Sequence, residues 1–278
     1  MGADIKQLRT RIKSVDSTLH LTKAMGLVAS SKIRKATDAM NKGKEYASAL
    51  EDTARQLTRY SECRKSPYME ARTPWENGRT CLVVVAGDRG LAGGYNANIF
   101  RTLREYEGAQ IIPVGKRACD RFDRGESGRI LYAEGFSYSD AKEIADSVCR
   151  DFVQKKIDRF GIVCTKYHSM MSQEAYVKWL LPLQAEENDS ADTGSGSAIF
   201  EPDEITVLNA MIPEYVAGMI VSAVKESFAS EVAARRVAMD SAGKNAQEMI
   251  DRLGLEYNRA RQGAITQEIT EIVAGSGI

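Results

Sequence analysis

The first 60 residues contain no proline, and their apolar residues recur with the spacing of a long helix. Steps of three and four residues alternate from the start of the chain, through Ile5, Leu8, Ile12, Val15 and Leu19. This alternation is typical of a coiled-coil seam, the stripe along which two helices pack. A helix over residues 3–58 would be about 84 Å long at 1.5 Å per residue. No compact domain needs a helix of that length, so the segment is expected to be a rod.

The apolar stripe is expected to continue through Met25, Val28 and Ile33. Strict seven-residue spacing breaks near Gly26 in this interpretation, which predicts that the seam drifts around the helix there.

The last 66 residues show the same texture, with no proline after Pro213. Proline is favoured in the first turn of a helix, where its missing N–H costs nothing, so a helix is predicted over 213–275, about 95 Å long. Its small and apolar positions are Val216, Met219, Ala223, Ala242, Ala246, Met249, Leu253, Ile265, Ile269 and Ile272. Two such rods most simply bury their stripes against each other as an antiparallel coiled coil.

The middle of the chain alternates predicted strands with predicted helices. Strands are expected at 80–86, 110–114 and 160–165, with a late strand offered by 175–181, and helices at 96–106 and 140–156. This alternation indicates an α/β domain with a mostly parallel sheet. Residues 186–196 read as an acidic loop rich in Gly and Ser. The predicted domains are therefore 1–60, 61–212 and 213–278.

The charge of the whole chain is balanced but unevenly distributed. Across 278 residues, 38 Lys and Arg offset 38 Asp and Glu, which argues against a surface uniformly adapted to nucleic acid or anionic lipid. Residues 1–60 nevertheless carry 12 basic and 6 acidic residues, whereas residues 213–278 carry 7 basic and 9 acidic ones. The two ends are expected to meet different partners. No secretory signal and no membrane-spanning run of about 20 apolar residues is expected.

Few residues are arranged as a metal or catalytic site. The five cysteines, Cys63, Cys81, Cys119, Cys149 and Cys164, form no CxxC pair, and they are expected to be reduced and mostly buried. Neither GxSxG nor HExxH occurs. His20 and His168 have no orienting partner nearby in sequence, and structural or surface roles are favoured for both.

A glycine-rich stretch at residues 87–94 follows the first predicted strand and precedes a helix. Dinucleotide-binding folds hold a pyrophosphate at such a turn, but neither GxGxxG nor a Walker loop is present. A tight turn in which Gly87, Gly90, Gly93 and Gly94 serve a structural purpose is therefore favoured. A nucleotide-binding α/β enzyme remains the alternative from the enzyme class.

The basic N-terminal helix could meet phosphates, but its first tyrosine is Tyr46 and no aromatic residue is interleaved with the cations. An acidic protein partner is favoured, with residues 23–36 as the interface. A generic coiled-coil scaffold or nucleic-acid adaptor is the third hypothesis.

Three segments of the sequence resemble a known protein family. HLTKAMGLVASSKIRKA at residues 20–36 and the whole of residues 230–278 resemble the gamma subunit of F-type ATP synthases, and GDRGLAGGYN at 87–96 is similar to that family's central glycine-rich motif. The resemblance implies an antiparallel coiled coil of the terminal helices with a central Rossmann-like α/β domain. It also implies a non-catalytic rotor shaft that couples proton flow to ATP synthesis or hydrolysis and regulates both.

The implied partners are three alpha and three beta subunits, the epsilon subunit and the membrane c ring. No cofactor, no nucleic-acid partner and no insertion into the membrane are expected. The implied location is the cytoplasmic face of a bacterial plasma membrane. Matching positions imply that the coupling contacts are Lys23, Met25, Arg235, Arg261, Gln262, Thr266, Glu268 and Glu271. Gly26 stands where the family usually has Glu, and Arg117 replaces a usual Gly. The spacing of the cysteines does not resemble the redox switch of chloroplast relatives.

Overall fold

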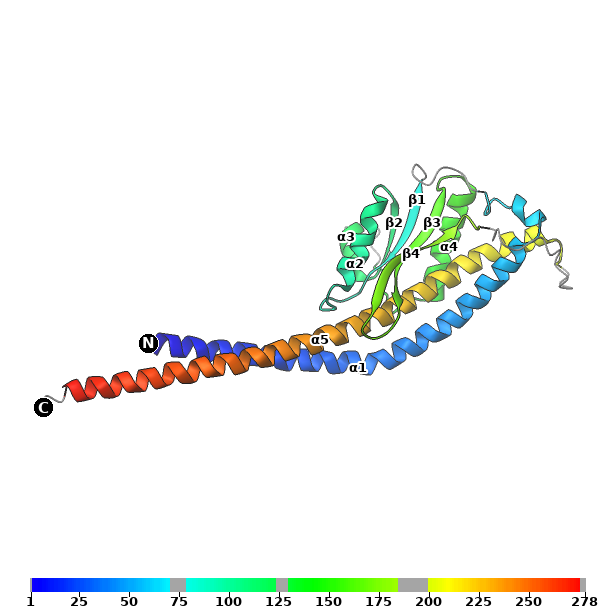
Figure 1. Cartoon of the computed structure of the whole chain (residues 1–278). Helices are drawn as coiled ribbons and strands as arrows, with labels where there is room; N and C mark the ends of the chain where they lie inside the picture. The colour runs from blue at the N-terminus through cyan, green and yellow to red at the C-terminus, as the bar shows by residue number, and fades with distance from the viewer. Residues whose placement is uncertain (1, 71–78, 124–129, 185–199, 276–278) are drawn as a thin grey trace. The chain divides into compact units, whose positions relative to one another are not determined.

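The computed structural model describes residues 2–70, 79–123, 130–184 and 200–275, so the acidic loop at 186–196 lies outside the described residues. The chain forms two compact units, one of residues 1–31 with 235–278 and the other of residues 32–234. Helix α1 (Gly2–Thr58, 57 residues) and helix α5 (Glu204–Gly275, 72 residues) each contribute to both units (Figure 1). The first unit consists of paired helices, and the second contains the sheet.

Helix α1 keeps a strict seven-residue repeat from one end to the other. The positions that are buried or half-buried at alternating steps of three and four are Ile5, Leu8, Ile12, Val15, Leu19, Thr22, Gly26, Ala29, Ile33, Ala36, Met40, Gly43, Ala47, Leu50, Ala54 and Leu57. The predicted drift at Gly26 and the predicted path through Val28, which is 53 % exposed, are therefore wrong. Beyond Leu19, many of these positions are occupied by glycine or alanine, which let the partner helix approach closely. We call these 16 positions the heptad seam.

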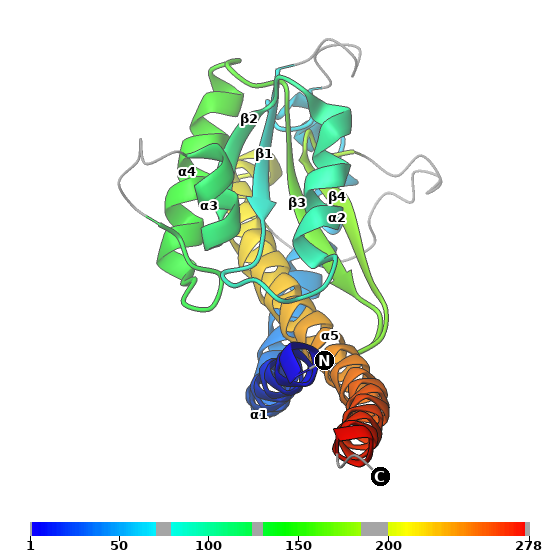
Figure 2. The same cartoon turned by 90° about the vertical axis from the view of Figure 1, so that its left-hand side faces the viewer.

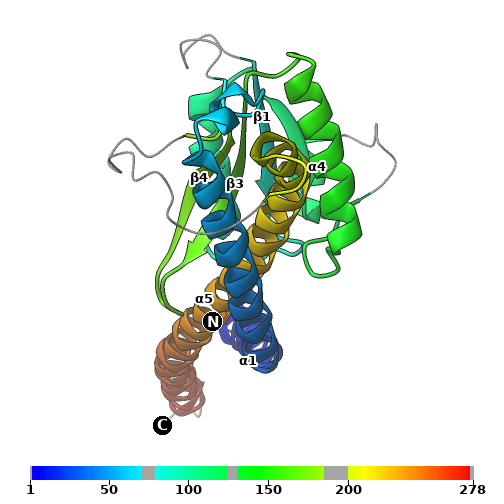
Figure 3. The same ribbon diagram turned by 90° about the vertical axis from the view of Figure 1, so that its right-hand side faces the viewer.

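The two long helices run antiparallel within each unit. In the first unit Gly26 faces Met239, and a Cβ placed on the glycine would be 3.6 Å from the Met239 Cβ. In the second unit Gly43 faces Ser222, at 3.6 Å from the Ser222 Cα by the same construction. Gly243 faces Leu19 in the first unit, and Gly218 faces Leu50 in the second. In each unit, residue numbers therefore rise along α1 as they fall along α5, which confirms the predicted antiparallel pairing. Figure 3 shows the C-terminal part of α1 beside the N-terminal part of α5.

Helix α5 begins at Glu204, earlier than the predicted start near Pro213. The reason is a side-chain cap: the Thr206 N–H donates to Asp203 Oδ1 at 2.8 Å, and the Thr206 hydroxyl donates to Asp203 Oδ2 at 2.9 Å. Pro213 lies inside the helix, where it removes one backbone hydrogen bond. Leu208 and Ile212 are fully buried before it, and their packing keeps the first turns helical.

The second unit contains one four-stranded sheet. Its strands are β1 (Thr80–Val85), β2 (Gln110–Val114), β3 (Arg159–Tyr167) and β4 (Gln173–Leu181), in the order β2-β1-β3-β4. Strand β1 pairs in parallel with β2 and β3, whereas β4 returns antiparallel to β3 as a hairpin. The mostly parallel sheet and the late strand are thus confirmed.

Helices cover both faces of this sheet, because successive side chains of a strand point to opposite faces. Cys81, Val83 and Val85 of β1 pack in one apolar cluster with α4 (Tyr138–Val153) and α5. Leu82 and Val84 pack in another with α2 (Tyr95–Thr102) and α3 (Lys116–Phe122). Figure 2 shows α2 and α4 on opposite sides of the sheet. Short 3-10 helices at Glu62–Lys65 and Leu103–Tyr106 complete the unit.

One 18-residue window of α5 has a mean hydropathy of 1.5, enough by composition to cross a membrane. Because 67 % of that window is buried inside the structure, packing within the protein accounts for its apolar character.

Replacing Gly26 with alanine is predicted to stabilise the paired helices. A Cβ there would be 3.3 Å from Arg236 Nη1, the mobile end of a long side chain, and in ordinary contact with Met239. The gain in helix propensity, about 1 kcal/mol, should therefore dominate. Thermal unfolding followed by circular dichroism should show a higher Tm. Gly254→Ala is the control, because its Cβ would meet nothing within 4 Å. A Tm raised by the control but lowered by Gly26→Ala would contradict this prediction.

Replacing Gly115 with alanine is predicted to destabilise the α/β domain severely. Gly115 has φ +90°, and its Cβ would lie 1.9 Å from the Ala86 carbonyl oxygen. Gly108→Ala is the matched control, with φ +84° and nothing within 4 Å of its Cβ, so it should cost only the backbone strain of about 1–2 kcal/mol. Urea unfolding should give a clearly larger loss for Gly115→Ala. Equal losses for the two variants would show that the contact with Ala86 is unimportant.

Candidate functional site

The implied contact residues fall into two groups on the paired helices. Lys23, Met25 and Arg235 lie near the level at which Gly26 faces Met239, and we call these three the collar. Lys23 is exposed, Met25 is half-buried and Arg235 is 9 % exposed. The other five residues lie at 261–271 on α5, roughly 40–54 Å farther along the helix at 1.5 Å per residue. The structure therefore does not bring the eight residues together.

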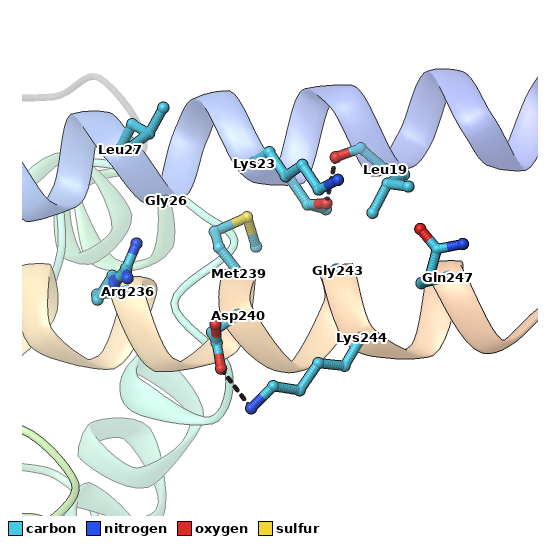
Figure 4. Close-up of a pocket in the computed structure, with 11 residues that line it drawn as sticks. Leu19, Lys23, Gly26, Leu27, Arg236, Met239, Asp240, Gly243, Lys244 and Gln247 are labelled. Carbon is cyan, nitrogen blue, oxygen red and sulfur yellow. Dashed lines mark hydrogen bonds and ion pairs between the residues drawn. The ribbon is translucent and has the colours of Figure 1, made fainter.

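A groove of about 470 Å³ lies beside the collar, between α1 and α5. Figure 4 shows how it is lined, with Leu19, Lys23, Gly26 and Leu27 on α1 and Arg236, Met239, Asp240, Gly243, Lys244 and Gln247 on α5. The floor is apolar, and the two glycines leave the space that side chains would fill. Three cations border the groove, against a single carboxylate.

That carboxylate belongs to Asp240, and Lys244 Nζ lies 2.9 Å from its Oδ2. The hydrogen bond from Lys244 lowers the pKa of Asp240 below its usual range, so it is ionised at neutral pH. No ion pair is present for Lys23 or Arg236 among the described residues. The border of the groove therefore presents net positive charge, which suits an acidic partner.

Met25 does not line the groove. It lies instead at helical spacing with Leu21, which is 58 % exposed, and Val28, which is 53 % exposed. Residues at i, i+4 and i+7 share one face of a helix, so these three form an apolar stripe away from the heptad seam. Sequence reasoning merged Met25 and Val28 into the seam. The structure separates them, and only the burial of Gly26 and Ala29 reveals the difference.

The last turns of α5 carry a second uncovered apolar stripe, which we call the tip stripe: Ile265, Ile269, Ile272 and Val273. These side chains are 42 %, 57 %, 70 % and 67 % exposed, respectively. Figure 1 shows α5 continuing past the N-terminal end of α1, which explains why no described residue of the first unit covers them.

Most of the implied contact residues of this region lie in or beside the tip stripe. At 100° per residue, Gln262 falls within the apolar arc, Thr266 lies at one edge of it, and Arg261 and Glu268 lie just beyond the other edge. Glu271 falls on nearly the opposite face of the helix. All five are exposed. The Thr266 hydroxyl bonds only its own helix, at 2.9 Å from the Gln262 carbonyl oxygen. This part of α5 is thus an apolar strip with a polar border, as in the contact face of a helix that meets another protein.

The glycine-rich turn after β1 uses its backbone amides internally. The Gly87 N–H donates to Asn96 Oδ1 at 2.9 Å, and the Arg89 N–H donates to Glu231 Oε1 at 3.3 Å. A Cβ on Gly87 would lie 2.8 Å from the Glu231 carboxyl, so a larger residue there would displace this carboxyl group. Amides bonded in this way are unavailable to a phosphate, and the nearby carboxylate of Glu231 would repel one. The turn is therefore poorly suited to a nucleotide.

The other three glycines of the turn differ in their roles. Gly93 adopts φ +58°, a conformation that favours glycine, and Gly94 precedes α2 as its N-cap. Gly90 faces Arg117, and a Cβ there would be 3.1 Å from Arg117 Nη2. Arg117 itself lies in the first turn of α3, and its N–H donates to the Gly87 carbonyl at 3.0 Å.

Asp88 is a residue of this turn that sequence reasoning missed. Its carboxylate accepts three backbone hydrogen bonds, from Lys116 at 3.2 Å and from Ala133 and Glu134 at 2.9 Å each. Glu231 was missed too, although an acidic residue between Ala229 and Ala233 was a detectable signal. Both carboxylates fix loops by bonding backbone amides.

Neither the cysteines nor the histidines line the groove. All five cysteines are free and buried, and burial raises the pKa of Cys81, Cys149 and Cys164 to about 12. His168 Nε2 lies 3.1 Å from Glu174 Oε2 on the surface, and His20 lies 3.7 Å from Asp16. Within the described part of the chain, no cluster of three or more potential metal ligands occurs.

Solved structures confirm the architecture. A rotor chain of the Euglena gracilis mitochondrial ATP synthase covers 95 % of this chain with a TM-score of 0.64 at 21 % identity. In another structure of that enzyme, described as OSCP/F1/c-ring in rotational state 3, a chain covers 100 % with a TM-score of 0.68 at 22 % identity. At such identities the likeness establishes the fold alone.

Sequence relatives are much closer. A family model described as ATP synthase matches residues 4–277. The ATP synthase gamma chain of Ruminococcus albus is 40 % identical, over 99 % of this chain and 98 % of its own length. The gamma chain of Acetobacterium woodii, described as sodium ion specific, is 36 % identical over 99 % of both chains. From this full-length agreement, the chain belongs to the ATP synthase gamma chain family.

Proposed function

We propose that this chain is the rotating central shaft of an ATP synthase, which couples ion flow through a membrane c ring to ATP synthesis or hydrolysis on a ring of three alpha and three beta subunits. The observation that carries the proposal is the tip stripe: four large apolar side chains, uncovered by the chain itself, at the end of a 72-residue helix. Exposed apolar stripes with polar borders mark contact surfaces.

The paired helices suit the transmission of torque. A single helix bends and twists readily, whereas two helices packed closely along the heptad seam resist both motions. Each charge that crosses the membrane supplies about 2.3 kcal/mol per 100 mV, so the work of several steps has to pass along the shaft. The seam holds the two helices in register while that work is transmitted.

The shaft acts on the ring through differential binding. A contact shifts a subunit between open and closed states only if it binds one state more tightly than the other. The groove offers cations above an apolar floor, Met25 adds an apolar side chain on a different face of α1, and the tip offers an apolar strip. Because these surfaces are asymmetric around the shaft axis, each rotation presents them to the three beta subunits in turn.

The two contact regions suit different partners. The groove beside the collar is bordered by Lys23, Arg236 and Lys244 and fits an acidic, partly apolar segment of a ring subunit. The tip stripe fits an apolar sleeve formed by several subunits. The chain itself supplies no catalytic group in this proposal, and the ATP chemistry belongs to the ring.

The remaining assignments extend this proposal. The α/β domain would contact the epsilon subunit and the c ring, and through them the shaft would regulate ATPase activity and ion flow. The complex would place this chain as a peripheral protein on the cytoplasmic face of a bacterial plasma membrane, with the proton as the coupling ion. The engaged amides of the glycine-rich turn disfavour the alternative of a nucleotide-binding enzyme.

Introducing a charge with Met25→Lys is predicted to impair coupling more than folding. Met25 is half-buried in an otherwise exposed stripe. The free energy of unfolding of the variant should therefore lie within about 0.5 kcal/mol of the wild-type value. A lysine at an apolar contact should disturb the ring, lowering ion pumping per ATP hydrolysed by about twofold or more. Pumping and hydrolysis are measured with the complex in sealed vesicles. Met25→Leu, which keeps an apolar side chain of similar size, should retain the wild-type ratio. An unchanged ratio for Met25→Lys would count against this contact.

Placing a carboxylate in the tip stripe with Ile269→Asp is predicted to weaken assembly without unfolding the chain. Ile269 is 57 % exposed, so the Tm of the isolated chain should barely change. Desolvating the new charge in an apolar sleeve should weaken binding to the alpha and beta subunits about tenfold, as measured by titration of the ring with labelled chain. Thr270→Asp adds the same charge outside the stripe and should bind nearly normally. Equal binding by both variants would rule the stripe out as the contact.

A further inference from the structure

Four polar residues of α5 are buried where this helix crosses the α/β domain. Ser227 and Ser230 are 0 % exposed, Glu231 is 1 % exposed and Glu226 is 8 % exposed. Burying polar groups is unfavourable unless hydrogen bonds compensate for the lost water. The hydrogen-bond partners of these residues therefore indicate the structural role of this part of α5.

Two of these residues bond strand β3 where its neighbour ends. Strand β1 pairs with β3 only as far as Val163. Beyond that point, the Thr165 N–H donates to the Ser227 hydroxyl at 3.0 Å, and the Tyr167 N–H donates to Glu226 Oε1 at 2.9 Å. Side chains of α5 thus accept the hydrogen bonds that a longer neighbouring strand would have accepted.

The same part of α5 bonds the glycine-rich turn and helix α2. Glu231 Oε1 accepts the Arg89 N–H at 3.3 Å, and the Ser227 carbonyl accepts the buried Tyr95 hydroxyl at 2.8 Å. Glu226 also pairs with Lys44 Nζ of α1 at 2.8 Å. The set therefore connects α5 with β3, with α2, with the turn after β1 and with α1.

These bonds differ in kind from the apolar contacts around them. Apolar packing is non-directional, so it opposes separation of two surfaces more strongly than it opposes sliding. Hydrogen bonds are lost steeply as distance and angle change. A shift of α5 by one residue would move its side chains by about 1.5 Å along the axis and about 100° around it, and would break every bond of the set.

We propose that Glu226, Ser227 and Glu231 form a polar seam that fixes the rotational and axial register of the α/β domain on α5, so that torque passes between this domain and the shaft without slip. The proposal rests on the proposed rotor function, since a register that bears load matters only in a shaft that turns.

The test compares Ser227→Ala with Ser230→Ala in the assembled complex in sealed vesicles. Both serines are fully buried on the same helix, but the Ser230 hydroxyl has no hydrogen-bond partner in the described parts of the chain. Ser230→Ala therefore removes a buried hydroxyl without removing a bond. Ser227→Ala leaves the Thr165 N–H unpaired. Two readouts are taken: amide hydrogen exchange at Thr165 and Tyr167, and ion pumping per ATP hydrolysed against a rising opposing ion gradient.

Ser227→Ala should speed exchange at Thr165 about tenfold and should lower pumping per ATP by about twofold near the limiting gradient, where load is greatest. Ser230→Ala should match the wild type in both readouts. If Ser227→Ala fails to assemble, Glu226→Ala, which removes the acceptor of the Tyr167 N–H at the edge of the seam, should give the same load-dependent loss.

The decisive comparison is between Ser230→Ala and whichever of Ser227→Ala and Glu226→Ala assembles. If the two complexes pump equally at every gradient, the proposal is overturned, even if amide exchange at Thr165 rises. A wild-type complex that hydrolyses ATP without pumping would instead overturn the rotor function itself, and the two failures are therefore distinguishable.

Discussion

The pairing of α1 with α5 through small residues is the constraint on which the rest of the structure depends. Six of the eleven positions of the heptad seam beyond Leu19 are glycine or alanine, so the helices are held by close approach more than by large interlocking side chains. Because most of the stability of a helix in a protein comes from packing, a 57-residue helix with such a seam depends on its partner. Because the partner is the other end of the same chain, the sequence of the α/β domain has to lie between the two long helices.

The inserted domain has to be attached firmly to α5, and two carboxylates, half-buried Asp88 and buried Glu231, contribute to this attachment. Asp88 bonds three loop amides, and Glu231 bonds the turn that Asp88 belongs to. Both residues use charge-assisted hydrogen bonds to backbone groups, which are stronger and more directional than apolar contacts. The glycine-rich turn, which resembles a nucleotide site in sequence, is in this structure a point of attachment between the sheet and α5.

The sequence predicted the periodic features well. Both long helices, four strands, the antiparallel pairing and the mostly parallel sheet follow from local spacing. Three features did not: the start of α5 at Glu204, the seam through Gly26 and Ala29, and the buried role of Glu231. The start of α5 depends on a local cap at Asp203, ahead of Pro213. The other two features depend on a partner distant in sequence or on a small residue whose burial no hydrophobicity pattern records. Met25 and Val28 were placed in the wrong stripe for the same reason.

Rotation of the chain inside an assembled complex tests the central claim most directly. All five native cysteines are buried, so Glu107→Cys in an exposed loop can carry a single optical probe while the alpha and beta subunits are fixed to a surface. Addition of ATP should turn the probe in one direction, in three major steps per revolution. ATP hydrolysis by the complex with a stationary probe would contradict the account.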